Sequence, residues 1–393
     1  MPNSKLTNFL LLPKLSLIKL EQKKYHSFYH CQTKTESIWC THCGLECFKV
    51  HDRRKVTIRD VPNLNKQKVF IITKKRFRCC GCKKVLTELL PGIKKSARLS
   101  ERFQRNLLYI CHKFACMKDV KSHFKVGNKT IYQRNYQQLQ LEWNKRKNNP
   151  WPKSIGIDEH SFIRNKQYGR REFVSLIVDH NNKRAKELIP GRNIGQLKES
   201  LAYIPGRSNV KNITMDLSST YRSFAEDFFP HAKIIADKFH VVRLPNRILD
   251  IYRNKIFKNK RLRLRKYLLM NSNKMDYWKR IEFQNELKKY PQLNEIYWVK
   301  EAIHKLYRCK GRKWAGKSLT NLTDALAFSE IAELKTLRKT LMKWREQILN
   351  YFETRLTNAR TEGFNTVCKQ LQRRAYGFRS FYNYRLKVLY ACS

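Results

Sequence analysis

The chain has 393 residues, of which 83 are Lys or Arg and 31 are Asp or Glu, giving a formal net charge of +52 and a pI near 10.1. It is 41% hydrophobic, so two or three domains with their own cores are expected, and no apolar run approaches the ~20 residues of a membrane span. These numbers exclude a membrane-spanning protein. A basic excess that extends from end to end predicts a nucleic-acid partner.

Residues 1–35 match no pattern that would give them a role. Their apolar stretch is interrupted by Pro13 and Lys14 and lacks a small-residue cleavage site, so no secretory signal peptide is predicted. We therefore expect the reducing cytoplasm of a bacterium, with the protein on the nucleoid. There, the paired cysteines among the twelve indicate metal binding more than disulfides.

Residues 36–92 carry two Cys-x-x-Cys pairs at the two ends of a predicted hairpin. The hairpin strands "RKVTIRDV" and "QKVFIITKKRFRC" alternate with period two around the turn "PNLNK". Four thiolates in this arrangement suit one structural Zn²⁺ in a zinc ribbon, although buried cysteines without metal are the alternative. The predicted ligands are Cys40, Cys43, Cys79 and Cys82. Alternative ligands nearby are His42, Cys47 and Cys80.

Residues 98–147 become helical and fit the spacing of a helix-turn-helix. Val120 and Phe124 face inward on a short helix, "VGN" makes the turn around Gly127, and the next helix turns Ile131 inward. The exposed start of that second helix would meet base edges in the major groove, whereas an ordinary helical hairpin is the alternative. The side chains predicted to contact DNA are Asn128, Lys129, Thr130, Gln133 and Arg134.

Residues 153–240 alternate strands and helices. Strands are predicted at "SIGID", "REFVSLIVD" and "AKELIP", the last two as a hairpin, and further strands at "VKNITMD" and "AKIIAD". Helices are predicted at "IGQLKESLAYI" and "SSTYRSFAEDFF", the second capped by Ser218 or Ser219. Three strands in hairpin order, followed by helix, strand, helix and strand, are the element order of the ribonuclease-H-like fold.

Residues 241–356 give no convincing strand signal and are predicted to be an all-α insertion of long amphipathic helices, one of them "AELKTLRKTLMKWREQILNYFETRL". Residues 357–393 then complete the core with a helix to at least Ala375 and an aromatic-rich tail. The predicted fold class is an α/β ribonuclease-H-like catalytic core in two pieces, with a large all-α insertion, preceded by a zinc ribbon and a helix-turn-helix.

Three acids are placed for catalysis. Asp158 ends the first strand and Asp216 the fourth, which are neighbours in this fold, and Glu362 begins the helix of 357–393. Converging carboxylates in a positive field would bind two Mg²⁺ (or Mn²⁺) ions for phosphodiester cleavage. Glu159 is expected to point away from Asp158, because neighbours on a strand alternate faces.

The helix that carries Glu362 has two distinct faces. Glu362 shares one with Asn365, Lys369 and Arg373, at i, i+3, i+7 and i+11. The other face, which we expect to pack on the sheet, consists of Phe364, Val367 and Leu371.

The chain resembles transposases of the ISL3 insertion-sequence family, which carry a zinc ribbon, a helix-turn-helix and a DDE core. From about residue 36 to the C-terminus, the matching stretches are "RKVTIRDVP" followed by "KRFRCCGC", "GIDEHSF", "ITMDLSSTYRSF", "AKIIADKFHVVR" and "TEGFNTVCKQLQRRAYGFRSFYNYRLKVL". Each stretch alone is weak, but their order makes the resemblance specific.

The resemblance implies that Asp158, Asp216 and Glu362 are the DDE triad. "DKFH" resembles a D-x-x-H signature of related transposases, which would place Asp237 and His240 beside the metal site as accessory residues. For His240, a satisfied histidine at a strand end is the alternative.

The implied function is a DNA transposase that binds the terminal inverted repeats of its own insertion sequence. It would cleave a strand at each end and transfer the 3′-hydroxyl to target DNA without a covalent protein–DNA intermediate. Its partner is double-stranded DNA, and a homodimer or larger synaptic assembly is expected because two ends must be joined. The alternatives are a domesticated zinc-dependent DNA-binding regulator and a ribonuclease-H-like DNA repair nuclease.

Overall fold

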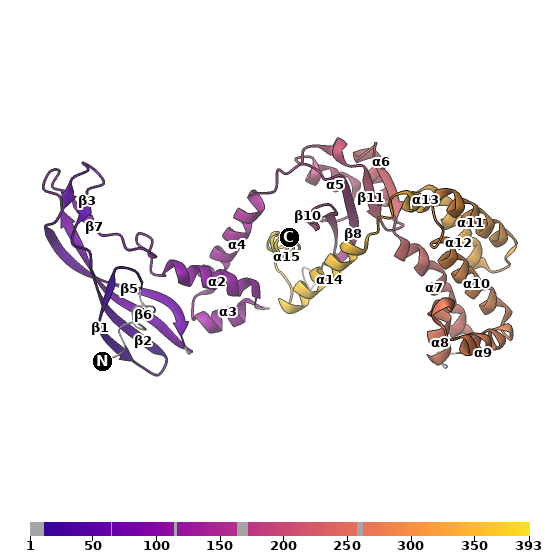
Figure 1. Cartoon of the computed structure of the whole chain (residues 1–393), viewed down its shortest axis with the longest axis horizontal. Helices are drawn as coiled ribbons and strands as arrows, with labels where there is room; N and C mark the ends of the chain where they lie inside the picture. Colours follow the sequence, from indigo (N-terminus) through magenta and orange to yellow (C-terminus); the bar gives the residue numbers. More distant parts are fainter. Residues whose placement is uncertain (1–11, 64, 114–115, 163–171, 258–261) are drawn as a thin grey trace. The chain divides into compact units, whose positions relative to one another are not determined.

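The computed structural model describes residues 12–63, 65–113, 116–162, 172–257 and 262–393 (Figure 1). The chain divides into two compact units, residues 1–138 and 139–393. Among the described residues, no helix is both long and apolar enough to cross a membrane.

The first unit is built on a five-stranded sheet with the order β1-β2-β6-β5 and with β7 beside β6. Its strands are β1 (Leu15–Gln22), β2 (His26–Thr33), β5 (Val50–Asn63), β6 (Lys66–Arg78) and β7 (Val85–Thr87). The antiparallel pairing of β5 with β6 confirms the predicted hairpin. A separate two-stranded sheet consists of β3 (Ile38–Trp39) and β4 (Glu46–Cys47).

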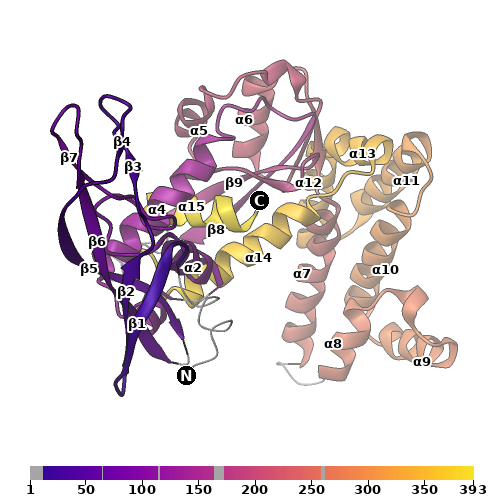
Figure 2. The ribbon, with the colours of Figure 1, turned by 60° about the vertical axis from the view of Figure 1, so that its left-hand side comes forward.

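Residues 1–35, which had no predicted role, supply two strands of this sheet. β2 pairs in parallel with β6 (Figure 2). Leu15, Tyr29 and Cys31 belong to the hydrophobic core of this sheet. Tyr29, Cys31 and Thr33 are buried at alternate positions of β2, which is the period-two signal of a strand. Residues 1–11 lie outside the described part of the chain.

Three helices follow the sheet and share a core of their own. They are α2 (Glu101–Lys113), α3 (Met117–Phe124) and α4 (Asn128–Asn144). Val120, Phe124 and Ile131 are buried, which confirms their predicted inward direction. The left-handed residue of the turn is Lys125 (φ 51°), whose N–H donates to the Lys121 carbonyl, and Gly127 has no positive φ.

Buried polar groups fasten these helices to the sheet. The Asp60 carboxylate accepts hydrogen bonds from Ser100 Oγ (2.5 Å) and Arg102 Nε (2.8 Å), and Lys68 Nζ lies 3.5 Å away. From the same strand, the Arg59 guanidinium donates to the carbonyl of Phe124 (2.5 Å), at the end of α3. The sheet and the three helices therefore form one structural unit.

Asp60→Asn is expected to lower the stability of this unit by about 3–5 kcal/mol, the cost of removing one partner from a buried ion pair. Burial alone would raise the pKa of Asp60, but hydrogen bonds from Arg102 and Ser100 hold it below its ordinary value. The stabilisation is therefore present at neutral pH and lost as the pH falls through the folded-state pKa. Hydrogen exchange of β5 and α2 amides in the full chain measures it.

The control for this prediction is Asp52→Asn. Asp52 pairs with Arg76 at a side chain that is 38% exposed, and exposed pairs contribute about 0–1 kcal/mol. Equal losses of protection in the two variants would contradict a structural role for the buried cluster.

The second unit contains a five-stranded sheet with the order β10-β9-β8-β11-β12. Its strands are β8 (Ser154–Phe162), β9 (Glu172–Asp179), β10 (Arg184–Pro190), β11 (Asn212–Met215) and β12 (Lys233–Ala236). β8, β9 and β10 are antiparallel, whereas β11 runs parallel to both β8 and β12. All five strands predicted from the sequence are thus present.

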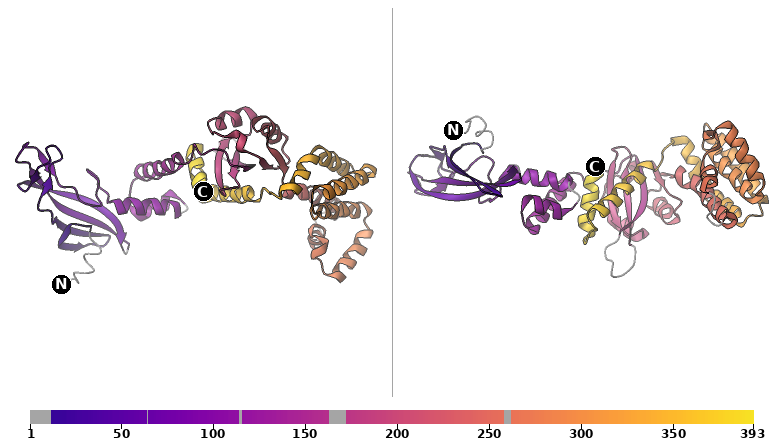
Figure 3. Two further views of the ribbon diagram at one scale, coloured as in Figure 1. Left: turned by 45° about the horizontal axis from the view of Figure 1, so that its top comes forward. Right: turned by 90° about the horizontal axis from the view of Figure 1, so that it is seen from below.

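Helices cover both faces of this sheet (Figure 3). They are α5 (Ile194–Leu201) and α6 (Ser219–Phe228) on one face, and α14 (Ala359–Arg374) and α15 (Phe381–Ala391) on the other. Ile155 and Ile157 of β8 pack toward α5 and α6, while Gly156 between them faces α14. The predicted cap is confirmed, because the Ser218 hydroxyl accepts from the Tyr221 N–H.

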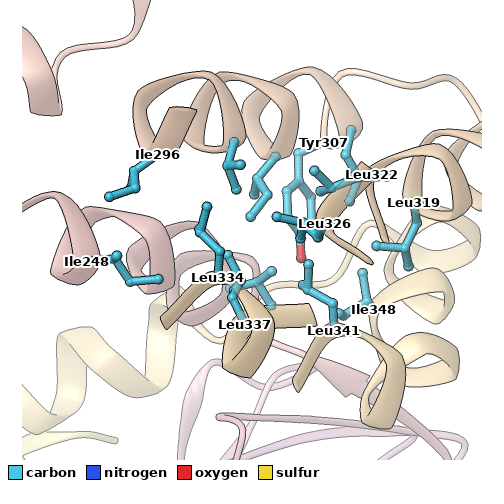
Figure 4. Close-up of a cluster of buried hydrophobic side chains, with 14 of the residues drawn as sticks. Ile248, Ile296, Tyr307, Leu319, Leu322, Leu326, Leu334, Leu337, Leu341 and Ile348 are labelled. Atoms are coloured by element: carbon cyan, nitrogen blue, oxygen red, sulfur yellow. The ribbon is translucent and has the colours of Figure 1, made fainter. Parts of the chain in front are cut away.

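The predicted insertion is helical, apart from residues 258–261, which lie outside the described part. Its helices are α7 (Lys238–Phe257), α8 (Leu262–Leu269), α9 (Tyr277–Lys288), α10 (Pro291–Leu306), α11 (Arg312–Ala325), α12 (Ala332–Lys343) and α13 (Arg345–Thr354). Leucines and isoleucines from all seven helices form a shared core, part of which is drawn in Figure 4. The single helix predicted over the last two is wrong: buried Trp344 leaves the helical conformation and separates α12 from α13.

Candidate active site and metal centre

The start of α14 lies directly on β8. At Gly156, a Cβ atom would collide with Thr361 Oγ1 and would lie 2.6 Å from Asn358 Oδ1. Only glycine permits this close approach of helix and strand. Two residues farther along the same face of β8 is Asp158, which is thereby brought under α14.

Asp158 and Asp216 form a half-buried acidic pair. β11 runs parallel beside β8 with Met215 opposite Ile157, so the two acids follow neighbouring positions. Burial, and then the negative charge of Asp158, raise the pKa of Asp216 to about 6. Burial likewise raises the pKa of Asp158.

One oxygen of this pair has no protein partner. Asp158 Oδ1 accepts from the Glu159 N–H (2.7 Å) and Oδ2 accepts from Asn365 Nδ2 (2.8 Å). Asp216 Oδ1, in contrast, is buried without a hydrogen-bond partner among the described residues. Two mutually repelling carboxylates with an unsatisfied oxygen are a donor set that fits a hard divalent cation.

Glu362 is in the first turn of α14 and is exposed. Asn358, four residues before it, donates to the Ile157 carbonyl (3.2 Å), and Asn365, three residues after it, donates to Asp158. Because i−4, i and i+3 share a helix face, Glu362 is on the stretch of α14 that lies along β8. The ligand atoms of the four cysteines all lie within 4.8 Å of one another, whereas in the described part of the chain the carboxylates of Asp158, Asp216 and Glu362 do not form a group this close.

The predicted packing face of α14 is wrong. The buried residues of the helix are Thr361, Asn365 and Cys368. The apolar residues that were expected to pack on the sheet are only half-buried, namely Phe364, Val367 and Leu371. The polar face is inside because Gly156 gives it room and because Asn365 finds buried hydrogen-bond partners.

Asp237 and His240 lie beside the acidic pair. Asp237 accepts from the Asn358 N–H (3.1 Å) and its Oδ2 is 3.2 Å from His240 Nδ1. This hydrogen bond raises the pKa of His240, and the charges of Asp237, Asp216 and Asp158 add to the effect. The raised pKa favours the protonated, hydrogen-bond-donating form of His240 next to the carboxylates.

Glu159 points to the opposite face of β8, as expected. It accepts from the Tyr221 hydroxyl of α6 (3.4 Å) and pairs with Arg192 (3.4 Å). Asp158 faces α14 instead, so the two consecutive acids have different surroundings.

The four predicted zinc ligands come together in two knuckles of equal geometry. The N–H of Cys40 donates to the Leu45 carbonyl (2.8 Å), and that of Cys79 to the Lys84 carbonyl (3.0 Å). In each knuckle the residue after the second cysteine has a positive φ: 76° at Gly44 and 59° at Lys83. The same turn is thus built twice, once between β3 and β4 and once between β6 and β7.

All four sulfurs lie within 4.8 Å of one another, with 3.5 Å between Cys40 and Cys82 and 3.4 Å between Cys43 and Cys79. Tetrahedral ligands at about 2.3 Å from Zn²⁺ would be roughly 3.8 Å apart, so the group could hold a metal ion. Backbone N–H groups of the turn, that of Cys82 first, lower the pKa of Cys79 to about 6. None of the alternative ligands belongs to the group: His42, Cys47 and Cys80.

The residues predicted to contact DNA lie at the start of α4. Asn128, Lys129 and Gln133 are exposed, and Thr130 is half-buried. Arg134 differs, because its guanidinium donates to Gln104 Oε1 of α2 at 2.6 Å. A partner from another helix could not be seen in the local sequence pattern.

A sequence model of a transposase family, the ISL3 type with a DDE core, matches residues 155–388, more than half of the chain. The chain belongs to the ISL3 transposase family. Its catalysed reaction is therefore DNA transposition, which confirms the resemblance inferred from the sequence. The family match begins in β8 and ends in α15, so the matched region of this ISL3 transposase includes the acidic pair, the helical segment of 241–356 and α14.

Two curated proteins are similar to this transposase. The transposase for insertion sequence element IS1001 of Bordetella parapertussis is 23% identical over 369 residues, covering 89% of this chain and 87% of that protein. An ATP-dependent protease of Lactococcus lactis subsp. lactis is 40% identical over 55 residues, only 14% of this chain and 18% of that protein. The first similarity extends over nearly the whole transposase, and the second over a short segment.

Proposed function

We propose that this transposase cuts the ends of its insertion sequence with Asp158, Asp216 and Glu362 as the DDE triad. The observation that carries the proposal is the half-buried pair of Asp158 and Asp216 at adjacent parallel strands, with the buried Oδ1 of Asp216 unpartnered among the described residues. The strand order, with three antiparallel strands and two parallel ones, supports a ribonuclease-H-like core made of residues 153–240 and 357–393 and interrupted by 241–356.

The carboxylates of the triad would hold two Mg²⁺ or Mn²⁺ ions. When bound, such ions activate the attacking hydroxyl and stabilise the leaving oxygen of a phosphodiester. The chain's own part is to gather the acids: β8 and β11 fix Asp158 and Asp216, and α14 brings Glu362 along the same strand. His240, held by Asp237, would in its protonated form donate an N–H to a DNA phosphate at the acids.

The N-terminal unit is proposed to bind the terminal inverted repeats. Residues 36–92 would be a zinc ribbon with one structural Zn²⁺, and 98–147 a helix-turn-helix that reads bases through the start of α4. With Arg134 tied to Gln104, the base-contacting set reduces to the exposed Asn128, Lys129 and Gln133, with Thr130 beside them.

The reaction that we propose has two steps. Hydrolysis at each end frees a 3′-hydroxyl, which then attacks target DNA directly, without a covalent protein–DNA intermediate. Two ends must be joined, so the working form is a homodimer or a larger synaptic assembly. Its place is the bacterial cytoplasm, on the nucleoid, where the double-stranded DNA is.

An excision and integration assay on a plasmid that carries the gene with its native flanking DNA tests this function. Movement with defined junctions would identify the ends that the transposase cuts. A sequence-specific footprint without metal-dependent cutting would instead indicate a DNA-binding regulator. Cleavage of branched DNA regardless of end sequence would indicate a repair nuclease.

Metal binding is expected to weaken as the pH falls below about 6. The pKa of Asp216 is raised to about 6, so its carboxyl is protonated below that value, and protons compete with metal for the ligand. Mn²⁺ affinity of the DNA-free protein, measured by electron paramagnetic resonance of the free ion, reports the effect. Metal-free DNA binding over the same range is the control, and an affinity for Mn²⁺ that stays flat down to about pH 5 would contradict the assignment.

A further inference from the structure

A chain of buried hydrogen bonds leads from α15 to the Asp158 carboxylate. Gln372 Nε2 donates to the Tyr384 hydroxyl (3.0 Å), and that hydroxyl lies 2.7 Å from His160 Nε2. His160 Nδ1 is 2.9 Å from Asn365 Oδ1, and Asn365 Nδ2 donates to Asp158 Oδ2 (2.8 Å). Tyr384 and His160 are 0% and 3% exposed, and Asn365 is 5% exposed, so water does not compete for the two central bonds, which His160 makes with Tyr384 and Asn365.

The donors and acceptors fit in one direction only. A carboxylate only accepts, so the Asn365 amide must turn its Nδ2 toward Asp158 and its Oδ1 toward His160. The Asn365 Oδ1 atom also only accepts, so His160 carries its proton on Nδ1. Its Nε2 then accepts a hydrogen bond from the Tyr384 hydroxyl. The alternative acceptor for this hydroxyl, the Cys368 carbonyl, is at 3.5 Å and makes the weaker bond.

A flipped Asn365 amide would cost two interactions at once. Its oxygen would then face the carboxylate of Asp158, and its NH₂ group would face a protonated Nδ1 of His160. The imidazole ring therefore fixes the orientation of the amide, and the amide fixes the carboxylate.

We propose that Asn365, oriented by His160 and Tyr384, is the positioning residue that fixes the Asp158 carboxylate next to Asp216 for metal binding. The inference rests on the proposed role of Asp158 as a metal ligand. Through this role, the C-terminal helix α15 contributes to metal binding. Its Tyr384 hydroxyl makes hydrogen bonds with His160 of β8 and Gln372 of α14. Groups that orient a metal ligand in this way typically contribute about 10–100-fold to metal affinity or activity.

Two substitutions test the chain, Asn365→Leu and Tyr384→Phe, each in the full-length protein. Mn²⁺ affinity without DNA, the single-turnover cleavage rate on end DNA and the thermal midpoint are measured for both. Asn365→Leu is expected to weaken Mn²⁺ binding and slow cleavage by about 10–100-fold. Tyr384→Phe, which removes one hydrogen bond two steps away, is expected to weaken both by about 5-fold.

The double variant separates positioning from packing. Asn365→Leu already interrupts the hydrogen-bond network, so adding Tyr384→Phe should cost no further Mn²⁺ affinity. If the two substitutions instead caused independent packing defects, their losses of Mn²⁺ affinity would add up. Val388→Ala is the matched control, because Val388 is equally buried, one turn after Tyr384 on α15, but its apolar side chain cannot join the hydrogen-bond network. It should lower the thermal midpoint and leave Mn²⁺ affinity unchanged.

Asn365→Leu and Tyr384→Phe variants that lose only thermal stability, as expected for Val388→Ala, would overturn the inference. Asp158→Asn distinguishes this from a failure of the proposed function. If Asp158→Asn abolishes Mn²⁺ binding while Asn365→Leu does not, only the positioning role falls. If Asp158→Asn binds Mn²⁺ and cleaves like the wild type, the assigned triad itself falls.

Discussion

Asp216→Asn is expected to slow cleavage at the element ends by at least about 10³-fold, the consequence of losing several kcal/mol of charge stabilisation from a metal ligand. End binding should stay at its wild-type affinity, because the predicted DNA-reading residues are in the N-terminal unit and Asp216 is in the other. Single-turnover cleavage with Mg²⁺ and a gel-shift titration without metal measure the two properties separately.

The same substitution should make the metal-free protein more stable. The pKa of Asp216 is raised to about 6 by burial and by Asp158, so at neutral pH folding confines a charge that would be more favourable in the unfolded chain. This penalty is absent below the unfolded-state pKa and fully present above about pH 6. Asn carries no charge, so the thermal midpoint of the metal-free variant should rise at pH 7.

Asp179→Asn is the matched control. Asp179 is buried at the end of β9 in the same sheet, but its carboxylate caps the following turn by accepting from the Asn182 N–H (2.9 Å). Its loss should lower stability and leave cleavage unchanged. Cleavage at the wild-type rate by Asp216→Asn, or an equal defect in Asp179→Asn, would remove Asp216 from the triad.

Local patterns predicted most of the second unit. The apolar segments before Asp158 and Asp216 are bounded by polar residues, so both strands could be read from the sequence. β11 ends at Met215, directly before Asp216, but the prediction that Asp158 ends its strand is wrong, because β8 continues to Phe162 through its pairing with β9. β1 and β2 were missed because basic and polar residues dilute their alternation and because β2 pairs with β6, some 40 residues away. Tyr29 and Cys31 are buried in a core that they share with Phe70 and Ile72 of β6.

The surroundings of the acids could not be predicted, because their partners are distant along the chain. Asn365 lies 207 residues from Asp158, and Tyr384 lies 224 residues from His160. On a helical wheel, Asn365 looks like a solvent-facing residue and Phe364 like a core residue. In the structure the opposite holds, because the absence of a side chain at Gly156 of β8 lets the polar face of α14 pack against the strand.

Cys79→Ser is expected to abolish zinc binding and to weaken end binding by at least about 10-fold. Structural zinc contributes about 10–16 kcal/mol to the folding of small zinc-binding peptides, and the knuckle region has little else to hold it. Its sheet has two residues in each strand, and its core contains few residues beyond the cysteines, chiefly Phe77. Zinc content by atomic emission and affinity by gel shift measure the two effects.

The neighbouring residue provides the control, because Cys80→Ser removes an exposed thiol that lies outside the four-sulfur group. It should keep one zinc per chain and wild-type affinity, whereas zinc loss in Cys80→Ser but not in Cys79→Ser would reassign the ligand. The unfolding caused by Cys79→Ser should also stay within the knuckle region. The five-stranded sheet has a separate hydrophobic core, which contains Tyr29 and Phe70. Metal-dependent nicking of non-specific DNA by the acids of the second unit should therefore survive, which would separate end recognition from strand cleavage.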